Sequence, residues 1–76
     1  GEVWTKKLSD GSVAVALFNR QGYTRKVTAV WSELELTGPQ TVRDIWRRKE
    51  LGKFATEFGA EVPPHGVVFL KVGQAR

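Results

Sequence analysis

Carboxylates are the side chains in this sequence best suited to acid–base chemistry. There are eight of them, Glu2, Asp10, Glu33, Glu35, Asp44, Glu50, Glu57 and Glu61. Hydrolysis of a glycosidic bond needs two carboxyl groups about 5–9 Å apart across a cleft. Asp10 instead belongs to a turn signal, and Glu57 and Glu61 share the polar face of one predicted strand. The spacing therefore predicts no catalytic pair.

Asp44 differs from the other acids because it interrupts an apolar stretch between Val42 and Trp46. A buried carboxylate is normally satisfied by hydrogen bonds or by a cation. We interpret Asp44 as a structural acceptor of a hydrogen bond or ion pair, with an arginine as one candidate partner.

Other catalytic side chains are sparse. His65 lies in a Pro-Pro-His-Gly turn, whereas a general base needs a substrate cleft and an orienting partner. Ser9, Ser12 and Ser32 lie in predicted turns without a histidine placed to activate them. The sequence has no cysteine and one histidine, so it offers no thiolate or histidine-rich metal site. We predict no catalytic residue, no metal and no cofactor in this chain.

Trp4, Trp31 and Trp46 are a large aromatic content for 76 residues. Sugar-binding modules stack aromatic faces on pyranose rings, so each tryptophan is a candidate sugar platform. Tryptophans also bury about 150–250 Å² each and are what a small core would use. Burial in the core, or against a neighbouring domain, is the alternative reading of all three.

The length and the net charge limit the class of protein that this chain can be. A chain of 76 residues makes one domain, spanning residues 1–76. Its net charge of +4 comes from Lys and Arg residues scattered along the chain, so we expect no nucleic-acid partner. No apolar run reaches the roughly 20 residues that a membrane helix needs, and we expect no membrane partner.

Period two dominates the hydrophobic pattern, and no helical period is sustained. We predict strands at residues 2–7, 12–18, 25–31, 40–46, 53–62 and 67–72, with a charged loop at 47–52. Residues 12–18 are apolar on both faces, so we expect a central strand that is covered on each side. Strands at this spacing without a βαβ unit indicate an all-β fold, a small antiparallel Greek-key β-sandwich of about six to eight strands.

Turn residues separate the predicted strands. Asp-Gly at positions 10 and 11 predicts a hairpin in which both central residues have positive φ. One helical turn is expected at residues 32–36 with Ser32 as its cap, and residues 73–76 should fray. The residues that we expect to be structural are Asp10, Gly11, Asp44, Trp46, Pro63, Pro64 and Gly66.

Several stretches together resemble a known family. Residues 2–6 (EVWTK) and 8–20 (LSDGSVAVALFNR) resemble the opening of the C-terminal domain of melibiase-type α-galactosidases, glycoside hydrolase family 27. Residues 42–47 (VRDIWR) resemble the VRDLW strand of that domain. Residues 51–52 (LG) and 62–67 (VPPHGV) also fit its pattern, and the similarity is loosest at residues 23–40. Four motifs in order and in register span nearly the whole chain.

The resemblance implies a non-catalytic accessory domain excised from a longer glycosidase. The parent would be a retaining α-galactosidase or a relative acting on N-acetylgalactosaminides or arabinopyranosides. Its N-terminal (β/α)₈ barrel would carry both catalytic aspartates, and this domain would present one apolar sheet face to that barrel. The parent would be extracellular or periplasmic, and the lack of cysteine favours a bacterial source. A carbohydrate-binding module that uses an exposed tryptophan is the alternative.

Overall fold

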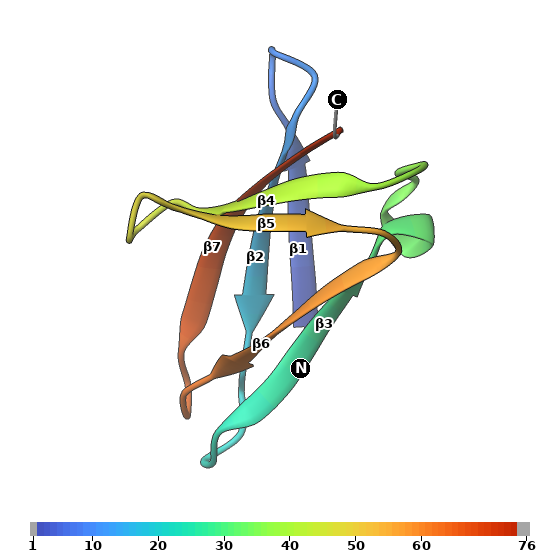
Figure 1. Ribbon diagram of the computed structural model, residues 1–76. Coiled ribbons are helices and arrows are strands. Elements are labelled where there is room, and N and C mark those ends of the chain that lie inside the picture. Colours follow the sequence, from blue (N-terminus) through green and yellow to red (C-terminus); the bar gives the residue numbers. More distant parts are fainter. Residues whose placement is uncertain (1, 75–76) are drawn as a thin grey trace.

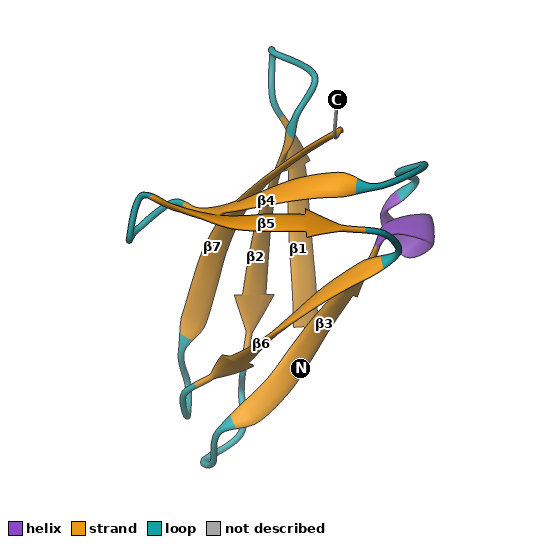
Figure 2. Cartoon of the chain, viewed as in Figure 1, coloured by secondary structure: helices purple, strands orange, loops and turns teal. Residues whose placement is uncertain are grey.

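The computed structural model describes residues 2–74, which form seven strands and one short 3-10 helix (Figures 1 and 2). The strands are β1 (Glu2–Lys7), β2 (Val13–Phe18), β3 (Arg25–Val30), β4 (Gln40–Asp44), β5 (Lys49–Phe54), β6 (Glu57–Val62) and β7 (Val67–Gln74). The helix η1 (Trp31–Leu34) links β3 to β4. The predicted all-β class is confirmed.

Two antiparallel sheets build the sandwich. The larger sheet has the strand order β1-β2-β7-β4-β5, and the smaller sheet consists of β3 and β6. Figure 1 shows β3 and β6 in front of β1 and β2. Because β7 is inserted between β2 and β4, the order along the sheet departs from the order along the chain, as Greek-key connections require.

The core lies between the inner face of the five-stranded sheet and the smaller sheet. Strand β2 contributes Val13, Val15 and Leu17, which alternate with residues on its other face. Its neighbour β7 contributes Leu70 and Val72. The remaining buried members of the cluster are Val27, Ala29, Trp31, Val42 and Val62. The prediction of a central position for β2 is confirmed, since β1 and β7 flank it.

The predictions for residues 47–62 were wrong in two places. Residues 49–52 belong to strand β5 and not to a charged loop, because Leu51 and Phe54 pack against the core while charged side chains face solvent. The predicted strand at 53–62 is broken at Ala55 and Thr56, where the chain crosses between sheets. The alternation of apolar residues stays in phase across this turn, and Phe54 meets Phe58 edge to face at 4.9 Å. Periodicity alone therefore could not reveal the break.

Strand ends also differ from the prediction. Strand β3 ends at Val30 and β4 at Asp44, while β7 continues to Gln74. Ser32 does not cap the helical turn: Val30 is the N-cap residue, without a side-chain hydrogen bond, and Trp31 begins the helix. Gly73 and Gln74 lie in β7 rather than fraying, and residues 75–76 lie outside the described part of the chain.

The turn between β1 and β2 is built around the Asp10 carboxylate. Only Gly11 has a positive φ (88°), so the predicted two-residue hairpin with positive φ at both centres is wrong. The loop is wider, with the Leu8 amide donating to the Ser12 carbonyl at 2.9 Å. Asp10 accepts from the hydroxyl and the backbone amide of Ser12, and it pairs with Lys71 of β7 at 3.0 Å.

These contacts make Asp10 a source of acid sensitivity. The hydrogen bonds from the Ser12 hydroxyl and amide, followed by the contact with Lys71, hold the pKa of Asp10 well below its usual range. A lowered pKa stabilises the fold above the unfolded value of about 3.9, and this contribution is lost as the pH falls below that value. We expect the free energy of unfolding of Asp10→Asn to fall less with decreasing pH than that of the wild type. Urea unfolding between pH 7 and pH 2 measures this difference. Glu57→Gln is the exposed control, and an unchanged pH dependence in Asp10→Asn would contradict the assignment.

Asn19 joins the two turns at the opposite end of the sandwich. It is buried, and its Nδ2 donates to the carbonyls of Tyr23 (2.7 Å), Val62 (2.9 Å) and Pro63 (3.2 Å). Its Oδ1 accepts from the Gln21 amide at 2.9 Å. One side chain therefore satisfies backbone groups of both the β2–β3 and β6–β7 connections.

Candidate functional site

The outer face of the five-stranded sheet carries two exposed aromatic residues, Trp4 and Phe69. Residues directly opposite in an antiparallel pair point to the same face. The register across β1, β2 and β7 therefore forms three rows, Lys6–Ala14–Lys71, Trp4–Ala16–Phe69 and Glu2–Phe18–Val67. No second layer of the described chain covers these rows, since both strands of the smaller sheet pack on the inner face.

The middle row is aromatic on both sides of a small residue. Trp4 is 52% exposed and Phe69 37% exposed, while Ala16 between them is only 1% exposed. Val67 is 38% exposed and lies opposite the half-buried Phe18 in the adjacent row. We call these five residues the docking face. Within residues 2–74, strand β2 is thus covered by a second sheet on its inner face only, and these residues do not supply the cover predicted for its other face.

Cations border the docking face, but most have partners. Lys71 and Arg43 lie opposite each other on β7 and β4. Lys71 pairs with Asp10 at 3.0 Å, and Arg43 pairs with Glu50 at 2.8 Å. The positive charge on this face is therefore largely compensated, which is unlike the uncompensated basic groove that tracks a nucleic-acid backbone.

A hollow of about 220 Å³ lies beside the docking face, where β4 ends and leaves β7. The β4–β5 turn, which projects on the β7 side in Figure 1, supplies Trp46 and Arg47, and the end of β4 supplies Asp44. Glu61 of β6 and Phe69 of β7 form the other wall. We call this feature the side hollow.

Trp46 stands in the side hollow and not in the core. Its side chain is 81% exposed and stacks on Phe69, with ring centroids 6.4 Å apart and planes at 19°. The structural role predicted for Trp46 is therefore limited to this contact. Ile45 holds the turn in place, since its amide donates to the Phe69 carbonyl at 3.1 Å.

Asp44 is half-buried and accepts a hydrogen bond within the β4–β5 turn. Its Oδ1 accepts from the backbone amide of Arg47 at 2.9 Å. The donor is the main chain of the same turn, and no arginine guanidinium of residues 2–74 pairs with Asp44. This bond closes the turn and sets the position of Trp46 within it.

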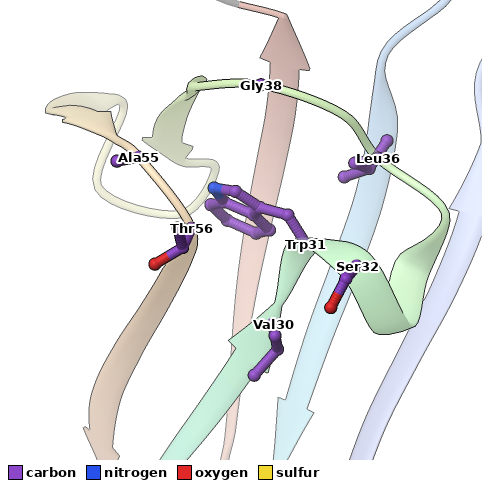
Figure 3. Close-up of a pocket in the computed structure, with 7 residues that line it drawn as sticks. All are labelled: Val30, Trp31, Ser32, Leu36, Gly38, Ala55 and Thr56. Carbon is purple, nitrogen blue, oxygen red and sulfur yellow. The ribbon is translucent and has the colours of Figure 1, made fainter.

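Trp31 is buried, so its indole cannot stack on a sugar ring. It is 2% exposed, and its indole N–H donates to the Phe54 carbonyl at 3.0 Å. Figure 3 shows the indole reaching from η1 towards Ala55 and Thr56, on the side away from Leu36. The cavity of about 230 Å³ at this point is lined by no charged side chain. Trp31 thus closes one end of the core.

The remaining predicted structural residues lie in the β6–β7 turn. The amide of Gly66 donates to the Pro63 carbonyl at 2.9 Å, and a Cβ at Gly66 would lie 2.8 Å from the Pro63 ring. Pro64 is exposed in the same turn, and His65 has a φ of 54°. Gly66 is required because the turn folds back on the Pro63 ring.

No catalytic constellation emerges from residues 2–74. Within this range the structure gathers no group of three or more His, Cys, Asp or Glu side chains able to hold a metal ion. The same residues include no helix long and apolar enough to cross a membrane. The exposed surfaces with a distinct character are thus the docking face and the side hollow.

Comparison with known proteins places the fold in a family. A family model described as the alpha galactosidase C-terminal beta sandwich domain matches residues 1–72. The chain belongs to this family. It corresponds to the C-terminal, non-catalytic domain of such enzymes, as the sequence motifs indicated.

Relatives of this sandwich domain are much longer proteins. An α-galactosidase from Cyamopsis tetragonoloba is 41% identical over 66 residues, which are 84% of this chain and 16% of that enzyme. An α-galactosidase from rice, Oryza sativa, is 39% identical over 66 residues, again 84% of this chain and 16% of the enzyme. The chain thus spans about a sixth of the length of these relatives.

Solved structures share the same sandwich. The α-galactosidase I of Mortierella vinacea matches with a TM-score of 0.86 and 30% identity, over 96% of this chain and 20% of that protein. A glycoside hydrolase family 27 β-L-arabinopyranosidase from Geobacillus stearothermophilus matches with a TM-score of 0.93 and 28% identity, over 97% of this chain and 17% of that protein. Relatives thus occur in plants, fungi and bacteria, and the similarity does not support the predicted bacterial source over the others.

Proposed function

We propose that this sandwich is the accessory domain of an α-galactosidase or a close relative, and that its docking face packs against the catalytic domain of the same polypeptide. The observation that carries the proposal is the aromatic row Trp4–Ala16–Phe69 on a sheet face without a covering layer. The relatives are about five to six times longer than the matched segment, so each has ample chain to supply the cover. We infer from the family resemblance that this partner is an N-terminal (β/α)₈ barrel.

Burial explains why the docking face is apolar. Monomeric proteins rarely expose contiguous apolar patches unless these mark an interaction site. Tryptophan often dominates binding energy at interfaces and phenylalanine is enriched there, and Ala16 between Trp4 and Phe69 is buried. The largely compensated cations beside them form the polar rim that interfaces usually have.

We expect Trp4→Asp to destabilise the full-length protein while barely changing the isolated sandwich. Trp4 is half exposed on an edge strand, so its loss costs the free domain little. At an interface, a buried charge in place of the aromatic ring should weaken domain association by about 2 kcal/mol or more. Guanidinium unfolding of both the full-length protein and the 76-residue chain measures this difference.

The matched control is Tyr23→Asp, which places the same charge at an aromatic residue of the β2–β3 connection that is 60% exposed and is not one of the docking-face residues. It should leave the full-length protein unaffected. Equal stability of the full-length protein with and without Trp4→Asp would contradict the docking role.

The activity and location of the parent belong to the same proposal. Its substrate class is a terminal α-galactoside or a related galacto-configured glycoside, as the names of the relatives suggest. We propose that the parent acts outside the cytoplasm, in the extracellular or periplasmic space. Assay of aryl α-galactoside hydrolysis in cell fractions tests both points, and the 76-residue chain alone should show no turnover.

A further inference from the structure

We propose that the side hollow binds one neutral pyranose ring, such as the terminal unit of an oligosaccharide, against the indole of Trp46. The side hollow shares Val67 and Phe69 with the docking face, but its proposed sugar contacts are made by other residues. The inference rests on three features of the hollow: an exposed and oriented aromatic ring, polar side chains with unused hydrogen-bonding capacity, and a matching size and charge.

The aromatic ring is exposed at a position where the fold gains little from it. A tryptophan contributes most when it buries about 150–250 Å², yet Trp46 is 81% exposed. Its stacking on Phe69, together with the Ile45–Phe69 backbone hydrogen bond, fixes the turn and the ring orientation. A pyranose has one face of C–H groups that packs on such a ring and a rim of hydroxyl groups that needs polar partners.

Polar partners stand around the indole. Asp44 uses Oδ1 for the Arg47 amide, while its Oδ2 has no hydrogen bond or ion pair within residues 2–74. The Glu61 carboxylate and the Arg47 guanidinium likewise make none with the described part of the chain, although both line the hollow. Sugar hydroxyls donate to carboxylates and accept from guanidinium groups, so the three side chains can satisfy neighbouring hydroxyls.

Size and charge select the class of ligand. The hollow of about 220 Å³ is smaller than the roughly 300–1,000 Å³ of sites that enclose a drug-sized ligand, so one sugar ring fits with one side open to solvent. Two carboxylates, Asp44 and Glu61, against one guanidinium, Arg47, give the hollow a net charge of −1. A neutral sugar is therefore favoured over a uronic acid, whose carboxylate would be repelled.

The test is a titration of the 76-residue chain with methyl α-D-galactopyranoside, followed by ¹H–¹⁵N spectra of the three indole groups. We expect millimolar affinity and a shift confined to the Trp46 indole, with Trp4 and Trp31 unmoved. Galacturonate should bind more weakly. Trp46→Ala should lower the affinity about tenfold, the upper range of one aromatic stacking contact.

Matched variants distinguish a specific sugar site from nonspecific binding. Trp4→Ala removes another exposed tryptophan and should leave sugar affinity unchanged. Arg47→Gln should weaken binding, whereas Arg48→Gln, one residue further along the same turn and outside the hollow, should not. A Trp46 indole that does not shift at tens of millimolar sugar, or equal affinity in Trp46→Ala, would overturn the proposal. Since docking is tested through Trp4 and sugar binding through Trp46, either can fail alone.

Discussion

Replacing Asn19 with aspartate is expected to lower the free energy of unfolding by about 3 kcal/mol, because a buried charge then meets backbone oxygens. The Nδ2 of Asn19 donates to three carbonyls across two turns. In the variant a carboxylate oxygen takes its place and can donate nothing at neutral pH. Protonation restores one donor, so the destabilisation should be smaller at pH 4 than at pH 7, as urea unfolding would show.

Two controls separate the charge from the lost hydrogen bonds. Asn19→Ala removes the donors without adding a charge and should cost about 1–3 kcal/mol with little pH dependence. Gln21→Glu makes the same amide-to-carboxylate change at an exposed residue of the same turn and should be nearly neutral. If Asn19→Asp matched Gln21→Glu, the two turns would not depend on this side chain.

Leu17→Ala is expected to cost about 2–5 kcal/mol, the range for truncating a buried leucine. Leu17 is fully buried on the central strand β2, between β1 and β7, where collapse of the cavity would require both sheets to move. A domain of 76 residues has roughly 4–11 kcal/mol of stability in total. A single truncation should therefore remove a large share of it, measurable by guanidinium unfolding at 25 °C.

The matched control is Leu51→Ala, the same truncation on the edge strand β5, where the side chain is only half buried. It should cost clearly less than Leu17→Ala. Similar losses of unfolding free energy in the two variants would mean that the inner face of β2 is no better packed than the sheet edge, which would contradict the buried position of Leu17.

Strand β2 links stability to the proposed role. Its inner side chains, including Leu17, form the core, while Ala16 and Phe18 on its other face support the docking face. The same six-residue strand thus faces a layer of its own domain on one side and, in our proposal, the catalytic domain on the other. This is why an apolar pattern on both faces of one strand was informative about function.

The importance of Asn19 was not predicted. The sequence shows an asparagine in a polar turn, and such a residue is ordinarily explained by local hydrogen bonding. Two of its bonds reach Val62 and Pro63, more than 40 positions away along the chain. A contact of that separation has no local signal, so only the packed structure could identify it.

The sequence by itself determined the all-β class, the bounds of β1, the central place of β2 and the family, because alternation and short motifs are local properties. The tertiary structure alone decided which tryptophan is buried. Trp31 and Trp46 both follow the end of a strand, but the segment after Trp31 and the β5–β6 turn cover its indole, whereas β4 ends before Trp46. The solvent exposure of a side chain depends on which other segments pack against it. Those segments lie far apart in the sequence, so their contact is known only from the tertiary structure.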